Sequence, residues 1–196
     1  MPEREPTIRP ARKSDATALA ALIDIAGEGL PAFLWNGMKS REQSVFEFGR
    51  ARAAREQDNF SHRNASIVEI DGDVAGCLID YRLDDPYVIG NLDELPEVVR
   101  PLIELEAKAP GSWYINAMAA FPEFRGQGIG TRLLALAEQR GRQHKAESAS
   151  LIVAGSNTGA MRLYAHTGYR EVARATVVTF PGCAHGGDWV LMVKPI

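Results

Sequence analysis

A glycine-rich turn directly ahead of a helical pattern constrains this chain more than any other feature. Glycine occupies three of the five positions from 126 to 130, and a helical pattern follows over residues 131–142. Glycine lets the backbone bend tightly and lets a ligand approach exposed N–H groups. A helix that begins here adds unpaired N–H donors and the positive end of its dipole. The turn therefore predicts a site for a phosphate group.

The order of residues in the turn excludes two common phosphate loops. A Walker loop has a lysine directly after its last glycine, whereas Thr131 follows Gly130 here. A dinucleotide loop has the spacing Gly-x-Gly-x-x-Gly, whereas this chain places glycine at alternate positions with Arg125 in front. The remaining structural explanation is a glycine-rich connection between strand and helix that binds nothing.

Composition narrows the class of protein. The 196 residues are 45% hydrophobic and 24% charged, which is ordinary for one soluble globular domain. The formal net charge of −3 gives no basic stripe, so we expect no nucleic-acid partner. Two cysteines are too few for a disulfide framework, and four histidines lack metal-ligand spacing. We therefore expect no bound metal. Because no apolar run reaches the length needed to span a membrane, we also expect a cytoplasmic protein with no membrane partner.

Periodicity and turn signals predict an α+β chain with a mixed sheet. The expected strands are residues 7–9, 66–70, 74–81, 112–120, 150–154, 172–180 and 189–193. One helix is expected to begin after an N-cap at Ser14 or Asp15, and the others are expected over residues 40–57, 92–107, 131–142 and 159–166. We expect residues 27–37 to form an aromatic loop, and Glu138 to face water on its helix. Residues 1–196 are expected to form a single domain, with a helical insertion at about 84–111.

Two spaced motifs resemble those of the GCN5-related N-acetyltransferase (GNAT) superfamily. The first is Arg125-x-x-Gly128-x-Gly130 after the segment 113–120, which resembles the acyl-CoA pyrophosphate loop and the fourth strand of that family. The second runs from Asn157 through Tyr164 to Gly168 and Tyr169. The order of elements matches the GNAT fold over almost the whole chain. The resemblance implies an α+β fold whose mixed, mostly antiparallel central sheet has helices on both faces.

The resemblance also implies an acetyl-CoA-dependent N-acetyltransferase, in which an amine attacks the thioester directly in a ternary complex. Tyr164 would protonate the departing thiolate, although it could also simply pack its helix onto the sheet. Asn157 would contact the cofactor, although a helix N-cap explains it equally well. The backbone N–H of Met118 would polarise the thioester carbonyl. The cofactor-binding set would be Met118, Ala119, Ala120, Arg125, Gly126, Gln127, Gly128, Ile129, Gly130, Thr131, Asn157 and Tyr164, with Arg125 adding charge or clamping the turn.

The base and the acceptor stay open in the sequence. Many relatives carry a glutamate on the strand before the loop, but residues 114–117 contain no carboxylate. Glu28, Asp188, His185 or a water chain through Asn116 could take the proton. The acceptor is expected to be a small molecule or a protein or peptide amine, bound by residues 27–37 and 181–188, and acyl groups longer than acetyl stay open. The alternative is a non-catalytic acyl-CoA-binding or regulatory module, and the resemblance also allows a homodimer.

Overall fold

The structure is a computed structural model that describes residues 5–183 and 186–196. The chain forms two compact units, each made of two segments. The first unit holds Met1–Asp80 and Ala117–Leu133, and the second holds Tyr81–Asn116 and Leu134–Ile196. The expectation of one domain over residues 1–196 stays a prediction.

Three antiparallel strands build the sheet of the first unit: β1 (Thr7–Pro10), β2 (Ala65–Ile70) and β3 (Asp73–Arg82). Asp71 and Gly72 join β2 to β3 with φ angles of 54° and 87°. Two successive left-handed residues are the geometry of a tight hairpin turn, as the Asp-Gly pair predicts. Strand β4 (Trp113–Ala120) follows β3, and the Phe121 N–H donates to the Ala75 carbonyl at 2.9 Å.

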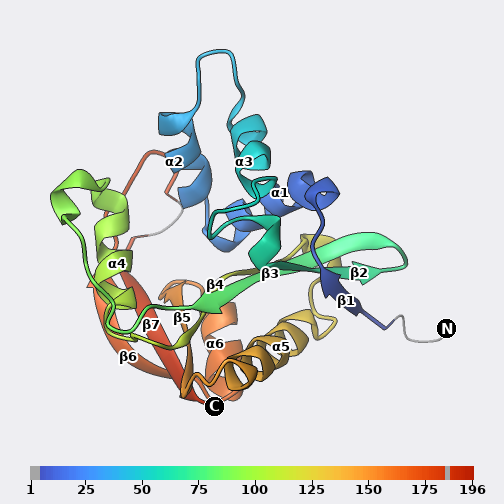
Figure 1. Cartoon of the computed structure of the whole chain (residues 1–196), viewed down its shortest axis with the longest axis vertical. Helices are drawn as coiled ribbons and strands as arrows, with labels where there is room; N and C mark the ends of the chain where they lie inside the picture. Colours follow the sequence, from blue (N-terminus) through green and yellow to red (C-terminus); the bar gives the residue numbers. More distant parts are fainter. Residues whose placement is uncertain (1–4, 184–185) are drawn as a thin grey trace. The chain divides into compact units, whose positions relative to one another are not determined.

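Helices α1 (Ala16–Ala26), α2 (Leu30–Met38) and α3 (Val45–Ala53) pack together in the first unit (Figure 1). The expected loop at residues 27–37 is wrong, because most of it forms α2. Gly29 reverses the chain with a φ of 89°, and α2 then begins at Leu30 with Pro31 in its first turn. Trp35 of α2 is buried, and its ring lies against Gly49 of α3. Helix α3 is shorter than the expected 40–57, since a Ser44–Glu47 capping box starts it late.

The second unit contains the other half of the strand pairings. Strand β4 pairs in parallel with β5 (Ser148–Ala154), which pairs antiparallel with β7 (Asp188–Pro195). Strand β6 (Arg170–Thr176) pairs antiparallel with β7. The seven strands follow the order β1-β2-β3-β4-β5-β7-β6 in a mixed sheet, as expected.

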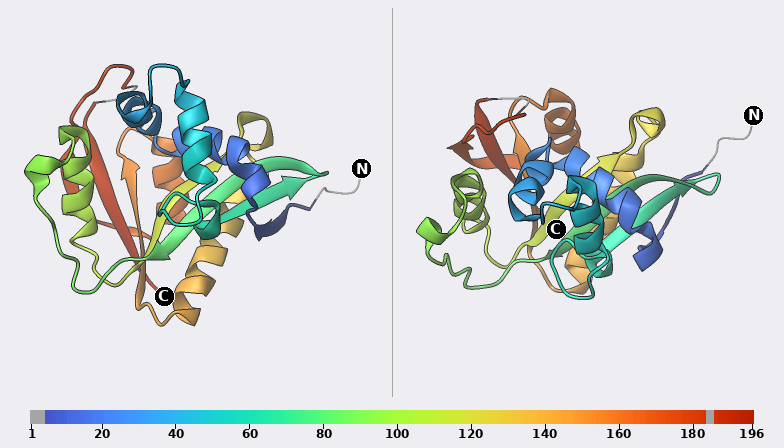
Figure 2. Two further views of the ribbon diagram at one scale, coloured as in Figure 1. Left: turned by 45° about the horizontal axis from the view of Figure 1, so that its top comes forward. Right: turned by 90° about the horizontal axis from the view of Figure 1, so that it is seen from above.

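The helices of the second unit lie beside these strands. Helix α4 (Arg100–Glu106) contacts β6 and β7, and both views of Figure 2 show it next to them. The helix expected at 92–107 is broken into two short 3-10 turns, Leu92–Glu94 and Glu97–Val99, before α4. Pro96 and Pro101 stand at the starts of the last two pieces. Helix α5 (Ile129–Gln143) continues from the first unit, and α6 (Thr158–His166) follows β5.

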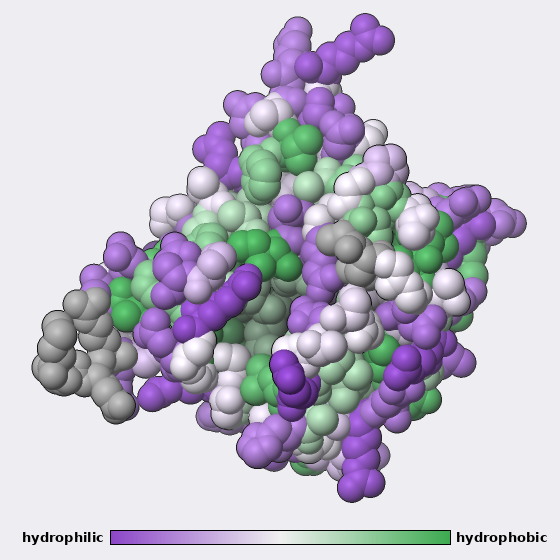
Figure 3. All heavy atoms as spheres, turned by 180° about the vertical axis from the view of Figure 1, so that it is seen from behind, coloured by the Kyte–Doolittle hydropathy of each residue, from purple (hydrophilic) through white to green (hydrophobic). Residues whose placement is uncertain are grey.

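Large hydrophobic side chains on the surface are few among the described residues and are scattered. On the face drawn in Figure 3, hydrophobic residues form separate patches between hydrophilic ones. The exposed set is Met38, Phe46, Val88, Ile89 and Val172. In the part of the chain that the structure describes, no single helix has the length and apolar character needed to cross a membrane; the bent pair Lys13–Ala26 and Leu30–Met38 meets that test only jointly.

Gly76 in β3 brings its strand unusually close to the end of β4. A Cβ at this position would lie 2.6 Å from the Ala119 carbonyl oxygen and 3.3 Å from the Ala120 Cα. Because both contacts are to backbone atoms, no side-chain rotation relieves them. The end of β4 at Ala119 can therefore approach β3 this closely only because residue 76 has no side chain.

We predict that Gly76→Ala lowers the free energy of unfolding by about 1–3 kcal/mol, since overpacking forces a backbone shift. Urea unfolding followed by circular dichroism measures this change. The control is Gly37→Ala in α2, where an added Cβ meets nothing within 4 Å. Alanine favours a helix, so the control should be neutral or stabilising by up to about 1 kcal/mol. Equal stability of Gly76→Ala and the parent would contradict the close approach.

Candidate functional site

The glycine turn of the first unit has the conformation of an anion-binding concavity. Gly126 and Gly128 are left-handed, with φ angles of 77° and 74°. A Cβ added to either would meet nothing within 4 Å, so the space around the turn is open. Glycine is favoured at both positions because of the left-handed backbone and not because of crowding. The Arg132 N–H donates to the Gly128 carbonyl at 3.1 Å, which begins α5. The turn thus ends where the N–H groups of a 15-residue helix are exposed.

The other predicted residues of the turn have distinct surroundings. Ile129 is buried and anchors the turn from below, while Gln127 and Thr131 are exposed and Gly130 is half-buried. The Arg125 Nε donates to the Ala120 carbonyl at 3.3 Å. Of the two roles open to Arg125, this contact fits a clamp between the turn and the end of β4.

The last residues of β4 present alternate amides to β3. The Ala119 N–H donates to the thiol of Cys77, and the Phe121 N–H donates to Ala75. Because successive amides of a strand point in opposite directions, those of Met118 and Ala120 point away from β3. This is the edge that the sequence assigns to an extended ligand. The ligand-binding roles of Met118, Ala119 and Ala120 stay predictions.

Helix α6 of the second unit carries Asn157 and Tyr164. The Asn157 side chain accepts a hydrogen bond from the Ala160 N–H at 3.1 Å, so its N-cap explanation is confirmed. Tyr164 is buried, with its ring 6.2 Å from that of Tyr169 in an edge-on arrangement. This packing supports the structural explanation of Tyr164, and its role as a proton donor stays a prediction.

A part-buried ion pair lies beside Tyr169 in the second unit, where the sequence predicted none. Glu138 is buried, so the expectation that it faces water is wrong. The Lys194 Nζ lies 2.7 Å from Glu138 Oε1 and 5.7 Å from the centre of the Tyr169 ring. Burial and the neighbouring Glu138 charge raise the pKa of Tyr169. Glu138 also lies 3.7 Å from Arg142 one turn along α5, but its shorter contact is with Lys194 of β7, more than 50 residues later, which local periodicity could not indicate.

A second carboxylate missed by the sequence is Glu106 of α4. The Tyr87 hydroxyl donates to Glu106 Oε2 at 2.6 Å, and the buried Tyr114 hydroxyl donates to the same carboxyl. Desolvation raises the pKa of Glu106 despite these donors. Strand β4 carries no carboxylate beside Tyr114, but the insertion supplies one. No signal in the sequence links the two segments.

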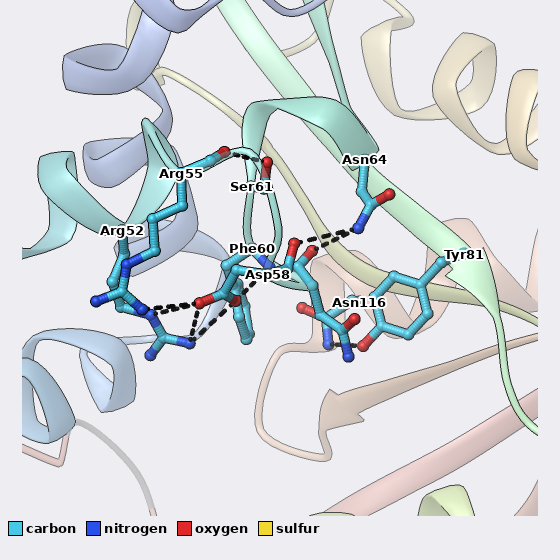
Figure 4. A network of polar contacts seen from close by, with 9 residues as sticks. Arg52, Arg55, Asp58, Phe60, Ser61, Asn64, Tyr81 and Asn116 are labelled. Carbon is cyan, nitrogen blue, oxygen red and sulfur yellow. Dashed lines mark hydrogen bonds and ion pairs between the residues drawn. The ribbon is translucent and has the colours of Figure 1, made fainter.

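Asn116 and Tyr81 form a further polar contact in the second unit, seen in Figure 4. The Asn116 Nδ2 donates to the Tyr81 hydroxyl at 2.9 Å, and the Tyr81 ring lies edge-on to Tyr114 at 5.8 Å. The Asn116 Oδ1 is buried and has no hydrogen-bond partner in the described residues. Figure 4 also draws a network of the first unit, in which Arg52 and Arg55 both hold Asp58.

The three side chains that the sequence offers as the general base are Glu28, Asp188 and His185. Glu28 is half-exposed in the turn after α1, with a φ of 52°. Asp188 begins β7 and lies 3.7 Å from the Arg174 guanidinium, so it is engaged in an ion pair. His185 lies outside the described residues. Across residues 5–183 and 186–196, no three His, Cys, Asp or Glu side chains are arranged to hold a metal ion.

We predict that Glu106→Gln stabilises the fold at pH 7.5. A carboxyl whose folded pKa is raised makes the folded state bind its proton more tightly than the unfolded chain, so ionisation costs stability as the pH rises above about 4.3. Unfolding by urea at pH 7.5 and pH 5 should show an advantage of the variant that shrinks at the lower pH. The exposed Glu104→Gln on the same helix is the control. A variant less stable than the parent at both pH values would contradict the prediction.

Comparisons with known proteins identify the relatives of this chain. The model of the "Acetyltransferase (GNAT) family" matches residues 33–169. An "N-alpha-acetyltransferase" of Sulfurisphaera tokodaii is 29% identical over 131 residues, which cover 66% of this chain and 68% of that protein.

Solved structures match the fold over nearly the whole chain. A structure described as an acetyltransferase superposes with a TM-score of 0.66 at 22% identity, covering 97% of this chain and 99% of the other. A ribosomal-protein-alanine N-acetyltransferase from Brucella melitensis has a TM-score of 0.61 at 21% identity, covering 97% and 99%. The protein yncA from Salmonella typhimurium, solved with its cofactor acetyl-CoA, has a TM-score of 0.59 at 17% identity, covering 97% and 93%. At these identities the likeness shows the fold alone.

Proposed function

This chain belongs to the acetyltransferase (GNAT) family, and from that premise we propose that it transfers an acetyl group from acetyl-CoA to an amine. The observation that carries the proposal is the pair of left-handed glycines, Gly126 and Gly128, at the start of α5 within the matched region. Their conformation leaves main-chain N–H groups as the donors of the site. Such donors suit a diphosphate, which coenzyme A carries.

The turn and the strand before it would bind different parts of the cosubstrate. The amides of residues 126–131 would bind the pyrophosphate, with Arg125 holding the turn to the end of β4. The outward amides of Met118 and Ala120 suit the extended pantetheine arm, which can pair with a strand edge. The Met118 N–H would then polarise the thioester carbonyl, and one such donor is worth about 3 kcal/mol of barrier.

We further propose that the acceptor is the α-amine of a peptide or protein. The Sulfurisphaera relative carries the name N-alpha-acetyltransferase. An α-amine has a pKa of about 7.7–8.0, so roughly a third of it is already neutral at pH 7.5. A lysine amine, with a pKa of about 10.4, is almost wholly protonated there and needs a strong base. The absence of a carboxylate from β4 therefore favours an α-amine over lysine.

The reaction balances with one proton donor and no covalent enzyme intermediate. The amine nitrogen forms a bond to the carbonyl carbon, the carbon–sulfur bond breaks, the amine's proton passes to water, and water returns a proton to the Tyr164 phenolate that is left after the thiolate is protonated. Tyr164 would supply a proton to the departing thiolate, since a phenol is still protonated at neutral pH. Cys77 is fully buried and its pKa is raised to about 12 by desolvation, so it does not serve as a nucleophile.

The direct test is acetyl transfer by the purified chain. Peptides with a free α-amine, N-blocked peptides that contain lysine, and small amines are incubated with acetyl-CoA while thiol release is followed. We expect turnover with the free α-amine peptides and none with the blocked ones. Tight acetyl-CoA binding by calorimetry without turnover on any amine would select a non-catalytic acyl-CoA-binding module instead.

We predict that Gly128→Ala weakens acetyl-CoA binding about 5- to 30-fold. Holding an L-residue in the left-handed region costs about 1–2 kcal/mol, and the turn relaxes instead of holding its amides together. Calorimetric titration measures the change. Gly90→Ala is the control, because Gly90 lies in an exposed loop with nothing within 4 Å of an added Cβ. Unchanged affinity in Gly128→Ala would remove the turn from the site.

We predict that Tyr164→Phe lowers kcat about 10²- to 10⁴-fold while acetyl-CoA binds as before, because only the proton donor is lost. Initial rates and calorimetry separate the two effects. Tyr169→Phe, which alters the neighbouring ring in the same way, is the matched control and should keep most of kcat. A Tyr164→Phe variant with full activity would assign the proton to another donor.

A further inference from the structure

Two neighbouring hydrophobic side chains of the second unit, the exposed pair Val88 and Ile89, face water. Val88 is 79% exposed and Ile89 is 40% exposed, and in the described part of the chain no other two large exposed hydrophobic residues are consecutive. They belong to the segment 83–99, which Figure 1 and both views of Figure 2 show as a green loop beside α4. Apolar area left in water is unfavourable. A partner that covers the exposed pair would recover that free energy.

The loop is held in place on both sides of the exposed pair. Before it, the Tyr87 hydroxyl donates to Glu106 Oε2 of α4 at 2.6 Å. After it, the Asn91 side chain accepts from the Asp93 N–H and donates to Glu94 Oε1, both at 3.1 Å. Because these contacts order the loop before a partner arrives, binding costs little conformational entropy. The exposed pair is therefore presented by a loop that is already ordered.

Negative charge accompanies the exposed pair. The segment 83–99 contains no basic residue and five exposed carboxylates, which are Asp84, Asp85, Asp93, Glu94 and Glu97. The other 20 of the 25 acidic residues of the chain are fewer than its 22 basic residues. The net negative charge of the chain thus comes from this one segment.

The basic residues that flank the segment leave most of this charge uncompensated. Arg100 of α4 lies 3.5 Å from Asp93, and its Nε also donates to the Leu95 carbonyl at 3.1 Å. Arg82 of β3 donates through Nε to the Gly111 carbonyl at 3.2 Å. Among the ion pairs of the described residues, only the one at Asp93 involves a carboxylate of the segment. The loop therefore combines an apolar surface with a local excess of negative charge.

The sign of this charge decides which class of partner suits the exposed pair. Nucleic acids and anionic membrane surfaces are negatively charged, so the loop would repel them. A symmetric contact with a second copy would bring the same carboxylates together across the twofold axis. A protein segment with both basic and apolar side chains suits the loop, because its cations meet the carboxylates while its apolar groups cover the exposed pair.

We propose that the loop 83–99 is a docking surface for a basic protein segment that carries apolar side chains between its cations. Contact with Val88 and Ile89 supplies affinity, because apolar groups at the centre of an interface dominate its energetics. The surrounding carboxylates attract the cations and select against acidic partners. This inference does not rest on the proposed function, since every residue that carries it lies in the second unit and none belongs to the acetyl-transfer site.

Fluorescence anisotropy with a labelled peptide of alternating lysine and leucine, acetylated at its N-terminus, tests this proposal. The blocked N-terminus offers no α-amine, so binding is measured independently of acetyl transfer. We expect saturable binding that weakens about 10-fold or more between about 50 mM and about 300 mM salt, because screening shortens the reach of the carboxylates. A peptide with glutamate in place of lysine should not bind.

The double variant Val88→Ser with Ile89→Ser tests the apolar contact. It should weaken binding of the basic peptide about 10-fold or more, because it removes the centre of the surface. Val172→Ser in β6 is the matched control, since Val172 is a large exposed hydrophobic residue of the same unit outside the loop. The control should bind the peptide within about twofold of the parent.

The double variant Glu94→Gln with Glu97→Gln tests the charge. It should weaken binding about 3- to 10-fold and reduce the salt dependence, while the shape of both side chains is kept. Glu147→Gln, which neutralises an exposed carboxylate of the same unit outside the loop, is the matched control and should leave both the affinity and the salt dependence unchanged.

Several results would overturn the proposal. These are a parent that does not bind the basic peptide saturably, a serine double variant that binds it like the parent, and equal affinity for the glutamate peptide. A dimer that the serine double variant dissolves would assign the loop to a second copy instead. Sedimentation of the parent with phosphatidylserine vesicles, lost in the same variant, would assign it to a membrane surface. Either assignment replaces the basic protein segment as the occupant.

Discussion

The structure depends on a backbone conformation that leaves N–H groups unpaired at the start of α5. Gly126 and Gly128 hold left-handed angles that an L-residue adopts only at a cost. Ile129 fixes the turn from beneath, and Arg125 ties it to the carbonyl of Ala120. Because the donors are main-chain groups, their positions follow from the turn itself rather than from side-chain rotamers. Pre-set donors of this kind bind an anion at a low entropic cost.

Strand β4 connects the glycine turn to the sheet. Gly76 allows β3 to approach its end closely, and the amides of Ala119 and Phe121 are used in that contact. The intervening amides point the other way. Farther back, the same strand presents Asn116 at the end of its ladder with β5, fixed by Tyr81.

Local signals in the sequence predicted the elements whose geometry is itself local. The Asp71–Gly72 hairpin, the glycine turn and the Asn157 cap are each decided by a few adjacent residues, and the structure has all three. Most of residues 27–37, expected to form a loop, forms α2 instead. The left-handed Gly29 turns the chain, and Pro31 favours a new helix directly after it. Family resemblance, rather than periodicity, supplied the fold as a whole, and the matching structures confirm it.

Contacts between distant segments could not be predicted in the same way. Glu138 has the spacing of a surface residue, but it is buried and pairs with the part-exposed Lys194 of β7. Glu106 stands in an insertion whose course the sequence does not indicate, and its pairing with Tyr114 is visible only in three dimensions. The unpaired oxygen of Asn116 has no sequence signal at all. In each case the environment of the side chain depends on a segment far away in the sequence, which local spacing does not reveal.

The central claim is that main-chain amides of the glycine turn bind the diphosphate of acetyl-CoA. Two-dimensional ¹H–¹⁵N NMR of the labelled chain, titrated with acetyl-CoA, observes those amides directly. The account predicts that the signals of Gly126, Gly128 and Gly130 are among the most strongly shifted. Saturable binding that leaves these three signals in place, while amides elsewhere shift, would contradict it.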